Sequence, residues 1–340
     1  MDVFFAAELP GAAVSLGDTI SKRYPGWYAR LADRSGFARG LALFRLGRSH
    51  PVVGAVCDAR GFWTFLFLEA WLGKHPPRVV VFELIRRRPS GWRRALYPLW
   101  FRIIARPAMR RTLRAGQVLT AWEREKYAGI FAVPAERLEF IPWPLIHRDD
   151  ELPPFDADPR QQMVLSSGRP ACDWETLFEA AAGREWPLTV VCGKKDLRRL
   201  QELNRDGRAR LLCDIPFEEH HALLKNASVY VISLMETDGS AGQVRLSNAV
   251  RAGAPVVATA IRGLAGYIAD EETGLTVRPG DWREMRIAIE SLLADAGKRK
   301  MLREAAFDRA RGWTFEEYID RMRELLREAG TGSQEFGPGQ

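Results

Sequence analysis

Two turns in the second half of the chain have the composition of a phosphate-binding site. The first, residues 239–243, has two glycines and precedes a segment that is expected to be helical to about Ala252, where Gly253 ends it. Unpaired N–H groups and the helix dipole attract anions at such a helix start. The second turn, residues 262–264, follows the apolar run 256–258, which is typical of a buried parallel strand. Because ligands bind beyond the carboxyl ends of such strands, the two turns predict a site for a phosphate-bearing ligand.

A basic segment in the first half, residues 86–114, contains ten arginines and no acidic residue. Arg102, Arg106 and Arg110 recur every fourth residue, which places them on one helical face, and Trp100 is among the apolar residues beside them. This combination indicates an amphipathic element on an anionic membrane surface. The alternatives are an ordinary surface helix and nucleic acid binding. Nucleic acid is not the partner that we expect, since no nucleic-acid-binding motif accompanies the arginines.

The elements that must position these residues alternate between strand and helix. Strands of the first half are expected at residues 52–56, 78–84, 118–120 and 138–141. Strands of the second half are expected at residues 163–166, 188–192, 209–213, 229–233 and 255–258, with helices between them and a further helix at 264–269. Strands that alternate with helices at this spacing predict a parallel, doubly wound sheet.

Length and composition favour a globular protein of two domains. The chain has 340 residues, of which 46% are hydrophobic. It contains no run of eighteen apolar residues that would span a membrane, and the amino terminus lacks the basic leader of a signal peptide. The four cysteines have no paired spacing, which indicates reduced thiols in the cytoplasm. Prolines and acidic residues between 142 and 159 predict an interdomain linker.

Four separated blocks resemble glycosyltransferase family 4, the retaining enzymes that use sugar nucleotides. The matching residues, in chain order, are Ala249, Gly253, Pro255, Val256, Val257 and Thr259, then Gly263, Gly266 and Tyr267, then Gly274 and Leu275, and last Pro279, Gly280 and Asp281. The resemblance implies an α/β protein of the GT-B fold, with two facing Rossmann-like domains that contain parallel doubly wound sheets. The N-terminal domain is short for this fold, so we expect it to be reduced.

The same resemblance implies a division of the chain into domains. Residues 1–148 would form the N-terminal, acceptor-side domain, and residues 160–314 the C-terminal domain that binds the donor nucleotide sugar. Residues 315–329 would be a helix that crosses back to the first domain. The tail, residues 330–340, is rich in glycine, serine and proline and is expected to be disordered.

Donor-binding residues follow from the resemblance. Arg169 matches the arginine that binds the diphosphate in the family, and Lys194 is the candidate for the lysine that usually accompanies it. The backbone of the glycine turn would bind the phosphates; its residues are Gly239, Ser240, Ala241, Gly242 and Gln243. Most members have two glutamates eight positions apart, which fall here on Ser240 and Asn248. Asn248 is expected to accept a hydrogen bond from the ribose without the charge of a glutamate.

Three carboxylates are candidate catalytic groups. Glu236 precedes Ser240 by four residues, which would place it near the donor sugar. Asp58 and Glu83 follow consecutive strand-like runs of the first domain, where either could contact the acceptor hydroxyl or the donor sugar. The alternative for each is an ordinary loop acid. The five histidines have no metal-binding spacing, and the resemblance implies neither a metal nor another cofactor.

The leading hypothesis is therefore a retaining, metal-independent glycosyltransferase that moves a sugar from a nucleotide diphosphate to an acceptor hydroxyl. We expect a glycan or lipid-linked acceptor, a role in polysaccharide or glycolipid biosynthesis, and a cytoplasmic protein that is peripheral on the inner face of the membrane. One alternative is a catalytically impaired sugar-nucleotide-binding or membrane scaffold protein of the same fold. Asn248 favours that alternative, and the intact donor turns oppose it. Another alternative is a different enzyme of this fold, such as a sugar-nucleotide epimerase.

Overall fold

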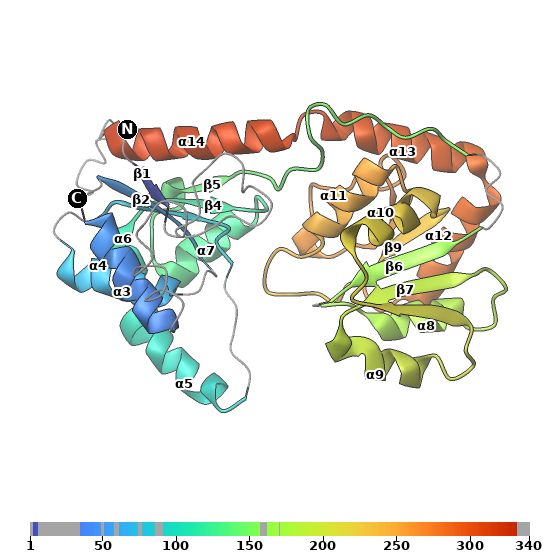
Figure 1. Cartoon of the computed structure of the whole chain (residues 1–340), viewed down its shortest axis with the longest axis horizontal. Helices are drawn as coiled ribbons and strands as arrows, with labels where there is room; N and C mark the ends of the chain where they lie inside the picture. The colour runs from blue at the N-terminus through green and yellow to red at the C-terminus, as the bar shows by residue number, and fades with distance from the viewer. Residues whose placement is uncertain are drawn as a thin grey trace. The chain divides into compact units, whose positions relative to one another are not determined.

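The computed structural model of the chain (Figure 1) divides into two compact units, Met1–Pro142 with Glu317–Gln340, and Trp143–Glu316. The structure describes residues 3–5, 35–48, 51–57, 61–73, 77–85, 91–156, 162–169 and 171–331, so most of the expected disordered tail lies outside the described residues. Leu145 and Ile146 belong to the core of the second unit, so the chain leaves the first unit before residue 148. Within the described ranges, no helix has the length and apolar character needed to cross a membrane.

The first unit is built on a parallel sheet whose described strands pair in the order of the chain. These strands are β1 (Val3–Phe5), β2 (Val52–Val56), β3 (Val79–Phe82), β4 (Leu113–Val118) and β5 (Leu138–Phe140). Strands β2 and β3 are short apolar runs that are buried along their whole length, as expected for a parallel sheet covered on both faces. Because each strand lies beside the next one in sequence, right-handed crossovers place the connecting helices on one face.

Different parts of the chain cover the two faces of this sheet. The face that includes Val53 packs against the crossover helices, which are α3 (Gly36–Gly47), α4 (Phe62–Leu72), α6 (Arg106–Thr112) and α7 (Glu123–Phe131). The opposite face, which includes Val52, packs against Tyr318 and Met322 of α14 (Phe315–Thr331). Figure 1 shows this helix in red, beside strands from the start of the chain. The core of the first unit therefore requires a helix from the end of the sequence.

The second unit contains a parallel sheet with the described strand order β11-β10-β9-β6-β7-β8. Its strands are β6 (Val164–Gly168), β7 (Leu188–Cys192), β8 (Ala209–Cys213), β9 (Val229–Ile232), β10 (Val256–Thr259) and β11 (Leu275–Val277). From β6 the chain proceeds outward to β7 and β8, and then returns to the other side of β6 with β9. The order therefore reverses between β6 and β9, and this reversal is the switch point at which open α/β sheets bind ligands.

Helices cover both faces of the second sheet. One face packs against α10 (Phe217–Asn226), α11 (Gln243–Ala252) and α13 (Ala296–Ala310), and the other against α8 (Trp174–Ala181), α9 (Lys194–Leu203) and α12 (Trp282–Ala294). The helix expected at residues 264–269 does not form. A 3-10 turn, Arg262–Leu264, is followed by turns in which Gly266 has a φ of 86°. This left-handed backbone is incompatible with a continuing right-handed helix.

Candidate functional site

The loops after β6 and β9 meet at the switch point of the second sheet. The N–H of Asp173 donates to the carbonyl of Ser233 at 3.2 Å, and the Ser233 hydroxyl donates back to the carbonyl of Asp173 at 2.7 Å. The first of these loops begins with Arg169, and the second leads into the glycine turn, residues 239–243. The fold therefore places Arg169 and the glycine turn, which were both predicted to bind phosphate, after neighbouring strands.

The glycine turn is held in place by close backbone packing. Gly242 precedes α11 with a φ of 97°, in the left-handed region that glycine adopts without strain. A Cβ atom on Gly263 would lie 2.8 Å from the nitrogen of Ala241 and 3.1 Å from the carbonyl oxygen of Gly239. The side chain of Gln243 is buried and donates to the carbonyl of Gly263. The two predicted turns thus pack against each other, directly before the start of α11.

Arg169 has a partner that orients it. It is exposed, and its guanidinium donates to Asp214, which follows β8, at 2.8 Å. A Cβ atom on Gly193, after β7, would lie 3.2 Å from Cγ of Arg169, so glycine there leaves room for the arginine stem. Lys194 is exposed at the start of α9, next to Gly193. Arg169 and Lys194 thus belong to adjacent strand ends of the second sheet.

Arg245 is a further cation at this edge, and the sequence interpretation did not select it. Its Nη1 donates to the carbonyl of Ser167 and to Sγ of Cys172, both at 3.3 Å. A Cβ atom on Gly168 would lie 2.6 Å from this Nη1, so the guanidinium rests against the end of β6. One signal was available in the sequence. Arg245 is in the first turn of α11, where a cation opposes the helix dipole, so a compensating role is expected.

A buried hydrogen-bond chain supports the end of β6. The Ser167 hydroxyl lies 2.6 Å from the hydroxyl of Tyr230 and 2.9 Å from Nε2 of His220. Burial, with a smaller effect of His221, lowers the pKa of His220, and burial raises the pKa of Tyr230. Both side chains are therefore neutral at pH 7, and they fix the strand end without adding charge.

The turn at residues 262–264 binds the side chain of Glu236 beside the glycine turn. One carboxylate oxygen of Glu236 accepts from the N–H of Arg262 at 3.3 Å, and the other accepts from its Nε at 3.4 Å. Asn248 is half-buried in the second turn of α11. Glu236 and the glycine turn are thus brought together.

In the first unit, Glu83 has a strained backbone. It follows β3 with a φ of 48°, which is unfavourable for a residue other than glycine. Its N–H donates to the side-chain oxygen of Gln117 at 3.2 Å, and the Gln117 amide donates to the carbonyl of Ile141 and to the hydroxyl of Tyr318. Because Gln117 is fully buried, this network fixes the Glu83 backbone. Asp58 lies outside the described residues.

The basic segment is helical in most of its described part. Helix α5 (Arg93–Trp100), a π-helical turn (Phe101–Ala105) and α6 follow one another without a break. Arg102, Arg106 and Arg110 are exposed, as expected for one face. Trp100 is different from the expectation of a surface residue: it packs edge-to-face on Trp63 of α4 with 5.3 Å between ring centroids, and it contacts the core.

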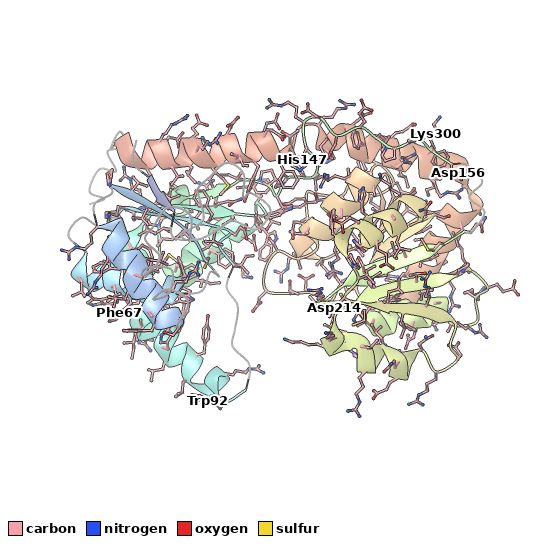
Figure 2. All side chains as sticks on the ribbon, in the orientation of Figure 1. Phe67, Trp92, His147, Asp156, Asp214 and Lys300 are labelled. Carbon is pink, nitrogen blue, oxygen red and sulfur yellow. The ribbon has the colours of Figure 1, made fainter. Side chains whose placement is uncertain are left out.

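Other apolar side chains are exposed near these arginines. Trp92, Leu96, Leu99 and Ile103 recur at helical spacing and are each more than half exposed. On the neighbouring α4, Phe67 and Trp71 are stacked at 4.7 Å and also exposed. Figure 2 labels Phe67 and Trp92, both at the surface of the first unit. The apolar face that the sequence predicted is present, with Trp92 rather than Trp100 as its tryptophan.

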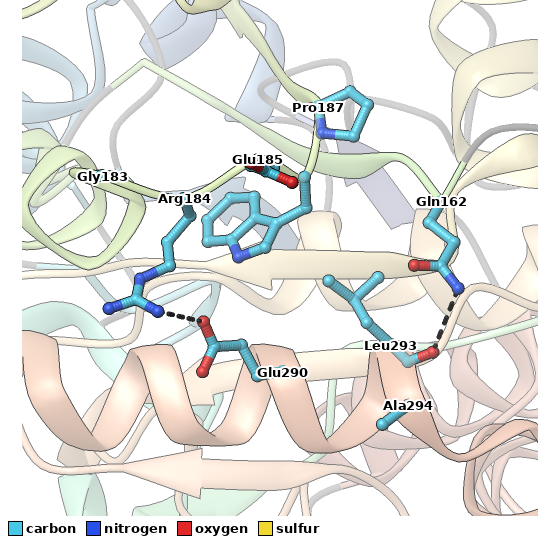
Figure 3. A pocket seen from close by; sticks show the side chains of 9 residues that line it. Gln162, Gly183, Arg184, Glu185, Pro187, Glu290, Leu293 and Ala294 are labelled. Atoms are coloured by element: carbon cyan, nitrogen blue, oxygen red, sulfur yellow. Dashed lines mark hydrogen bonds and ion pairs between the residues drawn. The ribbon is translucent and has the colours of Figure 1, made fainter.

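A large hollow in the second unit is separate from the switch point. It has a volume of about 660 Å³ and is lined by residues such as Gln162, Trp186 and Glu290 (Figure 3). Gln162 precedes β6 and Trp186 precedes β7, so the hollow is at the amino ends of these strands, opposite to the predicted donor site. Within the described part of the chain, no three His, Cys, Asp or Glu side chains group as a metal site would require.

The sequence of the second unit matches a family model. Residues 155–309 match the family described as glycosyl transferases group 1. A relative from Corynebacterium aurimucosum, D-inositol 3-phosphate glycosyltransferase, is 30% identical over 185 residues, which cover 54% of this chain and 39% of that protein. The chain thus matches about two fifths of the length of this curated relative. These findings confirm the resemblance that the sequence motifs indicated.

Solved structures share the fold over most of the chain. A structure of HepE from Anabaena in complex with UDP-glucose has a TM-score of 0.68 and 14% identity, and covers 86% of this chain and 82% of its own. Sucrose-phosphate synthase from Thermosynechococcus elongatus has a TM-score of 0.64 and 20% identity, and the match covers 87% of this chain and 79% of that protein. A glycosyltransferase from Rickettsia africae has a TM-score of 0.65 and 13% identity, and covers 86% and 81%. The α/β GT-B fold with two Rossmann-like units is thereby confirmed.

Proposed function

Because residues 155–309 carry a glycosyl transferases group 1 domain, we propose that the chain is a retaining, metal-independent glycosyltransferase that uses a nucleotide-diphosphate sugar. One observation carries the proposal. Arg169 follows β6 and the glycine turn before α11 follows β9, and these neighbouring strands form the switch point of the second sheet, which supports a diphosphate site there. A similar structure, HepE, binds UDP-glucose.

The reaction breaks the bond between the anomeric carbon and a diphosphate oxygen, and forms a bond from that carbon to the acceptor oxygen. The leaving diphosphate gains negative charge, which positive groups fixed in advance would stabilise. Arg169, Lys194 and the N–H groups of residues 239–243 are the groups that we assign to this role. Arg245 adds a positive charge at the same sheet edge. The proton of the acceptor hydroxyl passes to an oxygen of the leaving diphosphate as the new bond forms, so that atoms and charge balance.

Carboxylates are assigned to the reacting sugar and the acceptor. Glu236 is held by Arg262 beside the glycine turn, which supports a place near the donor sugar. Glu83 is our candidate for the acceptor side, because its strained backbone is fixed by Gln117 and strain of this kind clusters at active sites. Asp58 is assigned to the same side from its sequence position alone.

We place the protein at the inner face of the membrane, with a glycan or lipid-linked acceptor. The exposed apolar side chains of α5 and α4 would enter the lipid interface, while Arg102, Arg106 and Arg110 contact anionic headgroups. Charge complementarity supports lipid over a protein partner, since residues 86–114 contain only basic charges.

The alternative is a protein of this fold that binds the donor without transferring the sugar. Asn248 favours it, because most members of the family have a glutamate at this position. Binding and transfer must therefore be measured separately.

Titration calorimetry with UDP, GDP, ADP and their glucose conjugates tests the donor assignment. One of these nucleotide diphosphates should bind to the parent. Arg169→Ala should weaken the affinity for it by about 10–150-fold, because a charge-assisted contact is worth about 1.5–3 kcal/mol. Arg198→Ala is the matched control, since Arg198 is an exposed arginine of α9 away from the strand ends. Equal affinity in both variants, or no binding of any of these ligands to the parent, would overturn the proposal.

Mass spectrometry then separates the two candidate functions. The parent protein is incubated with the donor that binds and with a membrane extract, and sugar-modified lipids or glycans are sought. Transfer that is lost in Arg169→Ala supports the enzyme. Donor binding without transfer supports the binding protein instead.

A further inference from the structure

A second, smaller hollow in the second unit has the features of an anion site. It has a volume of about 80 Å³ and is lined by Ser228, which precedes β9, by Pro255, which precedes β10, and by Arg303 of α13. It is thus at the amino edge of the sheet, whereas the proposed donor site is at the carboxyl edge. A water molecule occupies about 30 Å³ in the liquid, so the volume suffices for a group of several heavy atoms.

Each of two residues that line this hollow has a buried side-chain atom with no hydrogen-bond partner among the described residues: Nε of Arg303 and Oγ of Ser228. The two residues are only 5% and 4% exposed. The Arg303 guanidinium donates through Nη2 to the carbonyl of Pro153, which neutralises none of its charge. A buried donor without an acceptor is costly, and a bound acceptor would remove that cost.

The charges around the hollow favour an anion. Lys225 and Arg299 line it together with Arg303, and Asp156 is the one acidic residue of the lining. Arg299 is one helical turn from Arg303 and is 3% exposed; its Nη1 donates to the carbonyls of Leu292 and Leu293. Three cations and one carboxylate leave the lining positively charged.

Helices α10 and α11 both end at this hollow, at Asn226 and Ala252. Their last carbonyls attract cations, which gives the arginines a structural role as well. That role does not account for the two unsatisfied atoms, because carbonyls at the helix ends accept from neither of them.

We propose that this hollow binds a small tetrahedral oxyanion of the size of inorganic phosphate. Nε of Arg303 and the Ser228 hydroxyl donate to its oxygens, and Arg299 and Lys225 supply further positive charge. The site is independent of the proposed sugar transfer.

The test is thermal unfolding of the full chain in inorganic phosphate, at an ionic strength held constant with chloride. Saturating phosphate should raise Tm of the parent by about 5 °C at a hundredfold excess over Kd. Ser228→Ala and Lys225→Gln should each weaken the affinity for phosphate at least tenfold. Ser228→Ala should also raise Tm by about 1–3 °C without phosphate, because it removes a buried hydroxyl that has no partner.

Arg169→Ala separates this site from the donor site. The variant should keep the full response to phosphate, even if the proposed donor assignment fails. The inference is overturned if phosphate does not stabilise the parent, if chloride at equal ionic strength has the same effect, or if the response is lost in Arg169→Ala and kept in Ser228→Ala.

Discussion

A Cβ atom on Gly263 would lie 2.8 Å from the backbone nitrogen of Ala241. The two residues belong to different turns, one after β10 and the other after β9, and glycine allows these turns to touch. The buried Gln243 side chain adds a hydrogen bond to the same glycine. The position of the proposed phosphate-binding backbone therefore depends on a residue that would itself contact no ligand.

Gly263→Ala should displace the glycine turn. We expect a loss of about 1–3 kcal/mol in the free energy of unfolding, since the methyl group overpacks against backbone atoms, and a weaker affinity for nucleotide diphosphate. Chemical denaturation and calorimetry measure the two effects. Gly129→Ala is the control: it is inside α7 with open space around its Cβ position, so it should stabilise by about 0.5–1 kcal/mol. Unchanged donor affinity in Gly263→Ala would contradict the role of the turn.

Asn248→Glu restores the residue that the family has at this position. If Asn248 meets the ribose, donor binding should be kept or strengthened, because a charged acceptor makes a stronger hydrogen bond. Calorimetry with the nucleoside diphosphate checks this. A dideoxy nucleoside diphosphate, which lacks the ribose hydroxyls, should show no gain; an equal gain with both ligands would exclude the ribose contact.

Changing Arg102, Arg106 and Arg110 together to Gln should release the protein from anionic vesicles. Each arginine near such a surface is worth about 1 kcal/mol, and salt weakens the attraction over a distance of about 8–10 Å. Liposome flotation at increasing salt measures it. The matched control changes Arg198, Arg205 and Arg208, which are exposed in the second unit, and should float like the parent. If the parent floats on neutral vesicles alone, or on no vesicles, the membrane assignment is wrong and residues 86–114 form an ordinary surface helix.

Glu69→Gln should destabilise the first unit by about 3–5 kcal/mol, because it leaves a buried arginine without its counter-charge. Glu69 is fully buried, and its two carboxylate oxygens accept from Nε and Nη2 of Arg78 at 2.5 and 2.8 Å. Urea denaturation measures the change. In the control, Glu202→Gln, the partner Arg198 is almost fully exposed, so the effect should be below about 1 kcal/mol. Similar losses in the two variants would contradict the prediction.

Asp150→Asn should destabilise the protein at pH 7 but not in acid. Burial raises the pKa of Asp150, but hydrogen bonds from Arg251 and from the N–H of His147 outweigh burial and lower it below the ordinary value of 3.8. A lowered pKa gives stability that is complete above the unfolded value and is lost as pH falls through the folded value. The difference in Tm between parent and variant should therefore begin to shrink as pH falls below about 3.8, and should vanish only below the lower folded-state pKa of Asp150. A difference that persists there would contradict the ion pair with Arg251.

Regular elements could be predicted because their local pattern and their packing agree. The apolar run at residues 188–192 is β7, and the segment between the glycine turn and Gly253 is α11. The turn after β10 was harder, because Gly266 is left-handed and ends a segment whose composition also suits a helix. Trp100 was predicted at the surface as one of the apolar residues beside the arginines, whereas its ring packs against Trp63 of α4, a contact that local sequence does not reveal.

Site residues that depend on distant parts of the chain could not be predicted from the sequence. Arg245 reaches the end of β6 from another helix, and its partners are about eighty residues away. The network from Glu83 through Gln117 to Tyr318 joins residues that are 201 positions apart in its last step. Local patterns contain no information about such contacts, so only the fold could reveal them.

The first unit is built from both ends of the chain, which constrains the order in which its parts fold on the ribosome. Its sheet is synthesised early, but among the described residues the face that includes Val52 and Val80 packs against side chains of the late helix α14, such as Tyr318 and Met322. Because the ribosome adds about 5–20 residues per second, this apolar face stays uncovered by α14 for roughly 10–40 s after its strands are synthesised. The second unit is contiguous and can fold within that interval. The nascent first unit is thus the stage at which we expect chaperones to bind this chain.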